Sequence, residues 1–184
     1  MMIGARIQYW RAANVVSSSL MFEHVRHKPT DPLDGAREIV VVCSPFRSRV
    51  NLSSIVRTAG CCGIKRIVAC GNATIDRSVA RDGADHVKIE KRRTLIPVLR
   101  TLREDGYTVV GLEQTTNSTS LHGFAFPRRV ALVVGNERTG LSDNELALVD
   151  ACVEIPVWGL PYSYNVATAT AMALYEYCKQ YPVG

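Results

Sequence analysis

Residues 130–140 read Val-Ala-Leu-Val-Val-Gly-Asn-Glu-Arg-Thr-Gly, so a short apolar run ends abruptly in a polar loop with a glycine at each end. An apolar run of this length, rich in valine, is typical of a strand that is buried on both faces. The glycines let the backbone turn tightly and approach a ligand, while Glu137 and Arg138 project between them. We therefore expect residues 130–134 to form a strand and the loop after it to carry chemistry.

Similar apolar runs recur along the chain, and helical patterns separate them. The expected strands are residues 39–43, 66–69, 86–90, 108–112, 130–134 and 152–155. The expected helices are residues 53–62, 95–104 and 166–180. This alternation predicts an α/β fold, with a parallel sheet covered by helices on both faces. In such folds ligands bind beyond the carboxyl ends of the strands, so we look for the functional site in the loops that follow them.

The first 38 residues differ in pattern from the rest of the chain. Apolar side chains between residues 3 and 25 recur at roughly helical spacing, and a polar segment broken by prolines follows. The alternating strand and helix patterns occupy residues 39–184, a length that suits one domain with a substantial core. We expect a helical extension and linker over residues 1–38 and a single α/β domain over residues 39–184.

The composition indicates a cytoplasmic protein with a polyanionic partner. Lys and Arg total 22 against 17 Asp and Glu, a formal net charge of +5, and nucleic acid is the commonest polyanion. The six cysteines include no Cys-x-x-Cys pair, as expected for free thiols in a reducing compartment. Arg6 and Arg11 interrupt the start of the chain where a signal peptide needs an apolar core. No stretch is long and apolar enough to span a membrane, so we expect no membrane association.

A basic loop, Ser-Pro-Phe-Arg-Ser-Arg-Val-Asn over residues 44–51, follows the first expected strand. Arg47, Arg49 and, in the next helix, Arg57 could all face one ligand, because guanidinium groups pair well with phosphate oxygens and a helix N-terminus adds backbone donors. The alternative is that Asn51 only caps the helix and the arginines are solvated.

The other two loops also have a structural alternative. The loop at 135–140 could be a simple strand-to-helix turn with Ser142 as the helix cap, and it matches neither a Walker loop nor a Gly-x-Gly-x-x-Gly dinucleotide site. The third loop, residues 155–165, contains two prolines and a glycine that fix an irregular backbone. There Ser163 or Asn165 could cap the helix that follows.

Three segments in these loops resemble the signatures of the SpoU-type RNA 2′-O-ribose methyltransferases, a TrmH-like group within the SPOUT superfamily. They are residues 51–59, residues 132–141 and residues 155–167, in the family's order and spacing. The resemblance covers roughly residues 39–177. Two positions depart from the family pattern, since Ser53 stands where Gly is usual and Tyr164 stands where Leu is usual.

The resemblance implies a fold and a cofactor that no local pattern could suggest. It implies a carboxyl-terminal deep trefoil knot, a homodimer, and transfer of a methyl group from S-adenosylmethionine to an RNA ribose 2′-hydroxyl. By position, the implied cofactor contacts are Leu112, Glu113, Gly135, Ile155, Leu160, Ser163, Tyr164 and Asn165. Residues 111–118 further resemble the tRNA-modifying branch that acts on a D-loop guanosine. A ribosomal RNA target is the alternative.

The same resemblance assigns catalysis to Arg57, Asn51, Glu137, Ser163 and Asn165. A guanidinium is effectively always protonated, so we expect Arg57 to clamp the adjacent phosphate and stabilise the developing alkoxide rather than act as a base. Asn51 would position the ribose or Arg57, and Glu137 would orient the arginine or another loop. Ser163 and Asn165 would shape the cofactor loop. The expected RNA contacts are Arg47, Arg49, Arg57 and Arg138.

Two other classes of function are weighed against an enzyme. A catalytically silent RNA-binding protein would keep the basic surface but lose Arg57, Glu137 or Asn165, and all three are present. A metal-binding module could start from His24-x-x-His27, but no cysteine or acidic cluster accompanies that pair, so we expect no metal.

Overall fold

The computed structural model describes residues 28–184, and Pro32–Gly184 form one compact unit within them. The helical pattern expected between residues 3 and 25 and the pair His24-x-x-His27 lie outside the described residues. The division expected between residues 38 and 39 stays a prediction.

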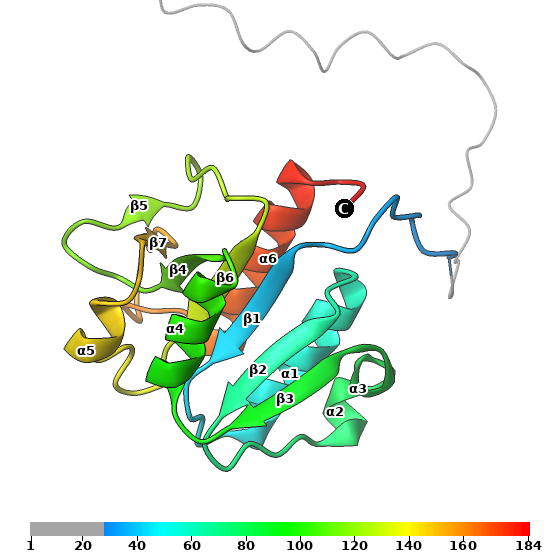
Figure 1. Cartoon of the computed structure of the whole chain (residues 1–184), viewed down its shortest axis with the longest axis horizontal. Helices are drawn as coiled ribbons and strands as arrows, with labels where there is room; N and C mark the ends of the chain where they lie inside the picture. Colours follow the sequence, from blue (N-terminus) through cyan, green and yellow to red (C-terminus); the bar gives the residue numbers. More distant parts are fainter. Residues whose placement is uncertain (1–27) are drawn as a thin grey trace, which may run out of the picture. The chain divides into compact units, whose positions relative to one another are not determined.

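A seven-stranded sheet forms the centre of the compact unit, and all its strand pairs run parallel (Figure 1). The strands lie in the order β3-β2-β1-β6-β4-β7-β5. Their bounds are β1 Ile39–Cys43, β2 Arg66–Cys70, β3 Lys88–Arg92, β4 Thr108–Leu112, β5 Thr119–Ser120, β6 Val130–Val134 and β7 Ala151–Glu154. The two central strands, β1 and β6, are buried along their whole length. The expected α/β class and parallel sheet are confirmed.

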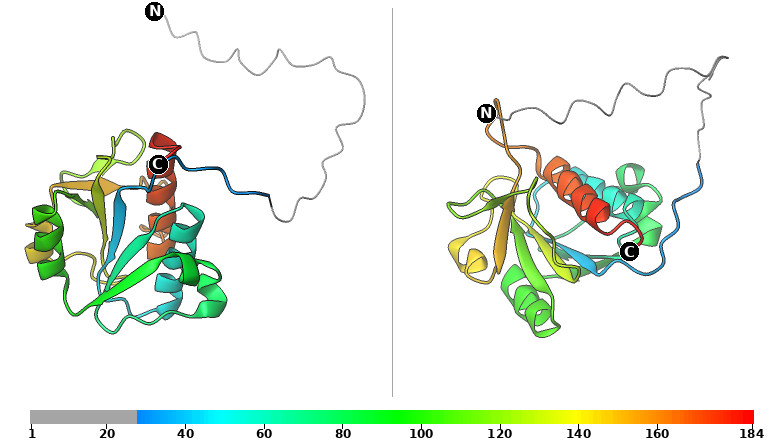
Figure 2. Two further views of the ribbon diagram at one scale, coloured as in Figure 1. Left: turned by 45° about the vertical axis from the view of Figure 1, so that its right-hand side comes forward. Right: turned by 90° about the horizontal axis from the view of Figure 1, so that it is seen from above.

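Helices cover both faces of this sheet, as Figure 2 shows. Their bounds are α1 Arg49–Cys61, α2 Arg77–Ala80, α3 Gly83–His86, α4 Leu95–Glu104, α5 Asp143–Leu146 and α6 Val166–Gln180. α1 and α6 pack on one face, where Val41 of β1 belongs to their core. α4 packs on the other face with Val40 and Val42. Successive β1 side chains thus enter opposite cores, which explains why the strand is apolar without alternation.

Several elements match their expected bounds residue for residue. These are the strands at 39–43, 108–112 and 130–134 and the helices at 95–104 and 166–180. Each is either a short, doubly buried apolar run or an amphipathic stretch with a clear end, so its bounds are local properties of the sequence. Among the described helices, none is long and apolar enough to cross a membrane.

Four expected elements have different bounds in the structure. The strand expected over 66–69 ends one residue later, at Cys70, and the helix expected over 53–62 ends one residue earlier, at Cys61. The first helix begins at Arg49 rather than residue 53, because Ser48 caps it by accepting a hydrogen bond from the Asn51 backbone N–H. The strand expected over 86–90 runs from residue 88 to 92, since His86 ends the short helix α3. The strand expected over 152–155 lies one residue earlier, at 151–154. The short elements α2, α3 and β5 were not expected at all.

Candidate ligand-binding and catalytic site

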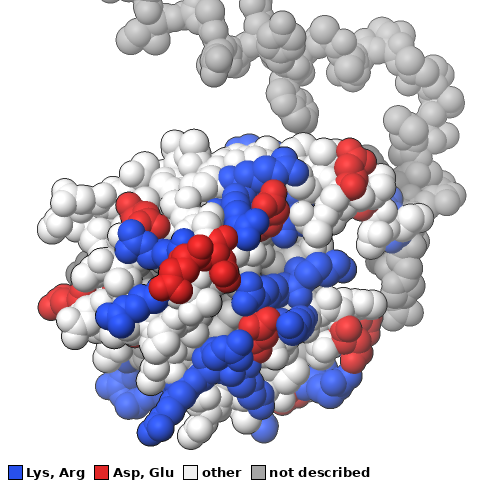
Figure 3. All heavy atoms as spheres, viewed as in Figure 1, with Lys and Arg blue, Asp and Glu red and all other residues white. Residues whose placement is uncertain are grey.

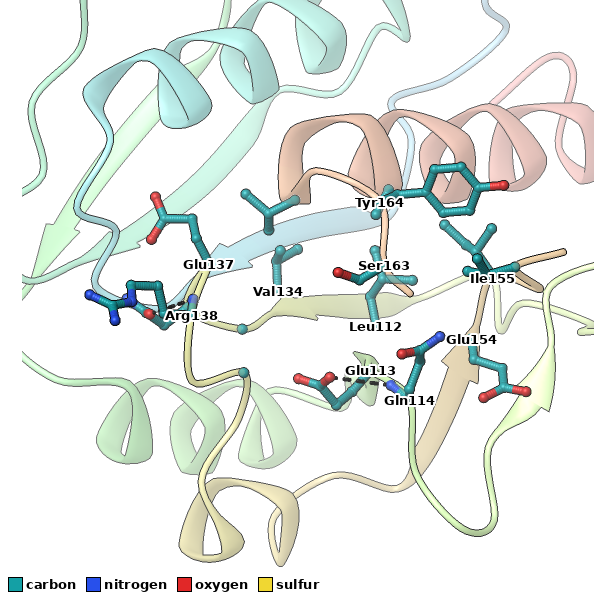
Figure 4. Close-up of a pocket in the computed structure, with 16 residues that line it drawn as sticks. Leu112, Glu113, Gln114, Val134, Glu137, Arg138, Glu154, Ile155, Ser163 and Tyr164 are labelled. Carbon is teal, nitrogen blue, oxygen red and sulfur yellow. Dashed lines mark hydrogen bonds between the residues drawn. The ribbon is translucent and has the colours of Figure 1, made fainter. Parts of the chain in front are cut away.

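A pocket of about 250 Å³ opens at the carboxyl edge of the sheet, where β4, β6 and β7 end and α6 begins (Figure 4). Six residues expected to contact a cofactor line it: Leu112, Glu113, Gly135, Ile155, Ser163 and Tyr164. The sequence places β6 late in the chain, but in the sheet it lies beside β1. The loops that follow these two strands are therefore neighbours at the edge where parallel sheets bind ligands.

The loop after β6 turns back on itself, and its two glycines are needed for that turn. Asn136 and Gly140 exchange backbone hydrogen bonds of 3.1 and 3.0 Å. A Cβ on Gly135 would lie 2.7 Å from the Gly140 carbonyl carbon, and one on Gly140 would lie 2.5 Å from Glu113 Oε2. Gly140 also has a φ of 63°, which disfavours any residue with a side chain. The glycines were expected to serve close approach to a ligand, and in the structure they serve close approach of this loop to itself and to Glu113.

Glu137 joins the loop after β6 to the loop after β1. Its Oε1 accepts hydrogen bonds from the Ser48 backbone N–H at 3.0 Å and from Asn51 Nδ2 at 3.2 Å. Its Oε2 accepts one from the Arg47 backbone N–H at 3.2 Å. Figure 4 shows the carboxylate turned toward α1. Of the two roles weighed for Glu137, the structure places it against another loop, and its hydrogen bonds do not include Arg57.

The pKa of Glu137 reports the same contacts. Burial by itself would raise this pKa, but the hydrogen bonds from the backbone of Ser48 and Arg47 and from the Asn51 amide outweigh burial and lower it. The side chain is therefore a carboxylate across the neutral range, which suits an acceptor of several hydrogen bonds at a helix N-terminus.

Asn165 extends this connection to the third loop. Its Nδ2 donates a hydrogen bond of 3.1 Å to Asn51 Oδ1. Its Oδ1 accepts from the backbone N–H groups of Ala167 at 2.9 Å and Thr168 at 3.4 Å and so caps α6. Asn165, Asn51 and Glu137 thus form one chain of hydrogen bonds through all three loops. The interpretation of Asn165 as a cap is confirmed, and that of Asn51 as the cap of the first helix is wrong, since Ser48 has that role.

The four arginines expected to contact RNA all have exposed side chains. Arg138 lines the pocket. Arg49 lies 3.7 Å from Asp76 in an exposed ion pair, which contributes little to stability. Within the described part of the chain, the side chains of Arg47 and Arg57 make no hydrogen bond or ion pair.

Two expected cofactor residues do not line the pocket, and several others that were not expected do. Leu160 is 76% exposed, and Asn165 turns to Asn51 instead. The pocket is also lined by Gln114, Asn136 and Glu154. Each of these lies next to an expected residue at the end of a strand, so extending the search by one residue at each strand end would have found them. Among residues 28–184, no group of three or more His, Cys, Asp or Glu side chains could hold a metal ion.

The parallel sheet carries a pocket at its carboxyl edge, and hydrogen bonds join the three loops there. This arrangement is typical of a ligand-binding α/β protein. The particular family follows from the sequence. The model of the SpoU rRNA Methylase family matches residues 38–175, and the chain belongs to that family.

Similar proteins support this assignment. The chain is 32% identical over 152 residues to the mouse tRNA (guanosine(18)-2′-O)-methyltransferase TARBP1, covering 79% of the chain and 10% of the mouse protein. A tRNA-modifying enzyme from A. aeolicus has a TM-score of 0.74 at 26% identity, covering 79% of this chain and 76% of that one. An AdoMet-bound rRNA methyltransferase from Sinorhizobium meliloti has a TM-score of 0.71 at 25% identity, covering 83% of this chain and 61% of that one. The chain thus spans only part of these proteins, a tenth of the mouse protein's length.

Proposed function

We propose that this protein transfers a methyl group from S-adenosylmethionine to a ribose 2′-hydroxyl of RNA. The observation that carries the proposal is the chain of hydrogen bonds from Asn165 through Asn51 to Glu137, which joins the three family signatures around one pocket. Membership of the SpoU family and the names of its relatives supply the reaction class.

The pocket suits S-adenosylmethionine in its size and lining. Leu112, Val134 and Ile155 offer aliphatic contacts for an adenine ring, and the irregular loops offer backbone donors and acceptors for its polar edge. The carboxylates of Glu113 and Glu154 also line the pocket and suit ribose hydroxyls or an amino group. A similar S. meliloti enzyme is described as AdoMet-bound. The bound cofactor would supply an activated methyl group on a good leaving group.

The protein's own residues would then align the RNA and stabilise charge. Arg57 would hold the phosphate beside the target ribose and stabilise the alkoxide as the 2′-hydroxyl loses its proton. The proton would pass to that phosphate or to water, because a guanidinium does not accept one. Asn51 would position the ribose, and Glu137 would fix the loop that presents Asn51. Ser163 and Asn165 would shape the loop over the cofactor, and Arg47, Arg49 and Arg138 would bind the RNA backbone.

We infer that the substrate is a transfer RNA, with a guanosine of the D-loop as the modified nucleotide. The relatives named for guanosine 18 of tRNA support this choice. Ribosomal RNA is the second candidate, and it is supported by a relative named as a 23S rRNA methyltransferase that is 32% identical over 136 residues. A silent RNA-binding role is less consistent with a site that retains Arg57, Asn51, Glu137 and Asn165.

We further propose a homodimer with a deep trefoil knot in its carboxyl-terminal part and a cytoplasmic location. In α6, Ala167, Ala173 and Leu174 pack inside the chain and so do not offer a surface to a second copy. Better support comes from the third loop, where Trp158 is 79% and Tyr162 is 80% exposed. The six cysteines are all free, which fits a reducing compartment.

The decisive experiment for the activity supplies the protein with S-adenosylmethionine carrying a labelled methyl group and with total RNA. We expect label in RNA and a 2′-O-methylated ribose at one mapped position. Calorimetry in the presence of a chelator should show cofactor binding, because the proposed site uses no metal. Absence of both cofactor binding and labelled RNA would contradict the proposal. For assembly, light scattering that gave the mass of one 20.3 kDa chain would contradict the dimer.

A further inference from the structure

A second pocket, of about 40 Å³, lies at the carboxyl ends of the neighbouring strands β1 and β2. The loop after β1 forms one wall, and the loop after β2 forms the other. Polar and cationic side chains dominate its lining: Ser44, Arg47, Ser48, Arg49, Asn72 and Thr74. No Asp or Glu of the described part of the chain lines it. The pocket therefore favours an anion over a cation.

Ser44 is the least expected member of this lining. It is 3% exposed, and its hydroxyl has no hydrogen-bond partner among the described residues. Its backbone N–H donates to the Val134 carbonyl at 2.9 Å, which fixes the residue at the junction of β1 and β6. A buried hydroxyl without a partner is unfavourable, and native proteins supply such groups with water, an ion or a ligand. Because Ser44 lines the pocket, we expect a group bound there to accept this hydrogen bond once the hydroxyl turns toward it.

The charges around the pocket favour an anion as well. The guanidinium of Arg47 makes no hydrogen bond or ion pair with the described residues, and Arg49 has only the exposed, long contact with Asp76. The N-terminus of α1 also borders the pocket, but the Glu137 carboxylate already accepts from the Arg47 and Ser48 backbone N–H groups there, so the two arginines carry the positive charge. Figure 3 shows further Lys and Arg side chains near the ends of β2 and β3.

The two thiols in the lining do not oppose this charge. Burial raises the pKa of Cys70 to about 11, and burial likewise raises that of Cys43. Both thiols are therefore neutral near pH 7. The thiols of the lining therefore add no negative charge to the pocket.

The size of the pocket limits what the anion can be. A water needs about 10 to 15 Å³ of such space, so 40 Å³ holds a group of a few heavy atoms and excludes a nucleobase. We infer that this pocket binds one phosphate group of the RNA strand near the methylated nucleotide, distinct from the phosphate that Arg57 would hold. This inference rests on the proposed function.

The position of the pocket links it to the cofactor site. Arg47 and Ser48 line the second pocket, and their backbone N–H groups donate to Glu137, which lines the first pocket. One loop therefore separates the two pockets. A phosphate on one side of this loop would hold the strand beside Asn51, at the loop's end, so that binding the backbone and presenting the ribose depend on the same segment.

Inorganic phosphate is the simplest probe of the pocket, and it does not depend on methyl transfer. In phosphorus NMR we expect saturable line broadening with the wild-type protein and its loss in Ser44→Ala and Arg47→Ala. Arg100→Ala is the matched control, since Arg100 is an exposed arginine of α4 outside both pockets. It should broaden the line as the wild type does. Equal broadening in Ser44→Ala and the wild type would overturn the assignment.

Ser44→Ala also separates a binding role from a structural one. Removing a buried hydroxyl that lacks a partner should leave the thermal midpoint unchanged or raise it. If binding is the role, the same change should weaken RNA affinity roughly tenfold, because a hydrogen bond to a charged group is lost. A lowered thermal midpoint with unchanged RNA affinity would show that the hydroxyl is structural and would overturn the inference.

RNA binding distinguishes a phosphate of the strand from free phosphate. The RNA association constant falls with salt concentration, and the slope of the logarithmic plot reports the number of phosphate contacts. We expect a shallower slope for Arg47→Ala than for the wild type, corresponding to the loss of about one phosphate contact. Binding of inorganic phosphate with no change in RNA affinity for either pocket variant would mean that the site takes the free ion, and the RNA assignment would be wrong. Failure of the proposed activity would appear separately, as absence of cofactor binding in a protein that still binds phosphate.

Discussion

The base of the three loops and their outer surface differ sharply in how their polar groups are satisfied. At the base, Asn51, Glu137 and Asn165 bind one another and nearby backbone groups. On the outside, Arg57 makes no hydrogen bond or ion pair with the described residues, and Trp158 is 79% exposed. The chain thus completes the framework of the site by itself and leaves the outer groups for a partner. We expect mutations at the base to change cofactor binding and mutations on the outside to change the RNA-dependent step.

The largest effect is expected at Arg57. Loss of one preorganised donor to a developing charge costs a factor of about 10² to 10³ in rate, so Arg57→Ala should lose that much methyl transfer. Cofactor affinity should stay nearly intact, because Arg57 does not line the pocket. Arg57→Lys should recover little, since an ammonium cannot reproduce the planar fork. Single-turnover rates at saturating cofactor and RNA measure this loss. Equal rates for wild type and Arg57→Ala would show that Arg57 has no part in the RNA-dependent step.

Variants of Glu137 test the base of the three loops. Glu137→Gln removes the charge from an acceptor of three hydrogen bonds and should weaken cofactor binding about tenfold or more, with a matching loss of activity. Calorimetry with S-adenosylmethionine measures the change. Glu104→Gln is a suitable comparison, because Glu104 is an exposed carboxylate of α4 that lies outside the pocket. If both variants behave alike, connecting the loops is not what matters about Glu137.

The same carboxylate predicts a pH dependence of stability. Its pKa in the folded protein is lowered from 4.5, so its contribution is complete above the unfolded value and is lost as the pH falls through the folded one. We expect the thermal midpoint of the wild type to fall below about pH 4.5 more steeply than that of Glu137→Gln. Parallel midpoint curves for the two proteins over the acid range would contradict the assigned contacts.

Substitution of Asn165 should have a smaller effect on cofactor binding and on stability. Asn165→Ala removes the cap of α6 and the bond to Asn51, and loss of a cap typically costs about 1 kcal/mol of stability. Asn165→Asp keeps the capping oxygen but cannot donate to Asn51. Denaturant unfolding of both variants separates the two roles. We expect Asp to retain stability while weakening cofactor binding in calorimetry, and unchanged cofactor binding in this variant would assign Asn165 to the helix alone.

The smallest effect is expected at Leu160. The resemblance to the family implies a cofactor contact there, whereas its side chain is 76% exposed and lies outside the pocket. Ile155 lines the pocket, so Ile155→Ala should weaken cofactor binding about tenfold through lost apolar contact. Leu160→Ala should change it by less than about twofold. Comparable losses for the two variants in calorimetry would mean that the third loop closes over the bound cofactor.

The sequence by itself determined the elements whose signals are local. The buried strands at 39–43, 108–112 and 130–134 and the helices at 95–104 and 166–180 follow from runs and periods that span only a few turns or residues. The three loops that carry the site were also found from sequence, because parallel strands place their carboxyl ends at one edge. Four-residue helices such as α2 and α3 are too short for such a signal. The start of α1 was misplaced because Ser48 and Asn51 are both good cap residues.

Only the tertiary structure decided which polar groups meet. Glu137 reaches Ser48 across 89 residues of sequence, and Asn165 reaches Asn51 across 114. These contacts depend on β6 lying beside β1, an order that no local pattern encodes because four strands, β2 to β5, intervene in the chain. The same juxtaposition buries Ser44, whose backbone N–H donates to Val134 at the end of β6. Residue types along the chain therefore specified the kind of chemistry, and the strand order specified which side chains serve the framework and which remain free for a partner.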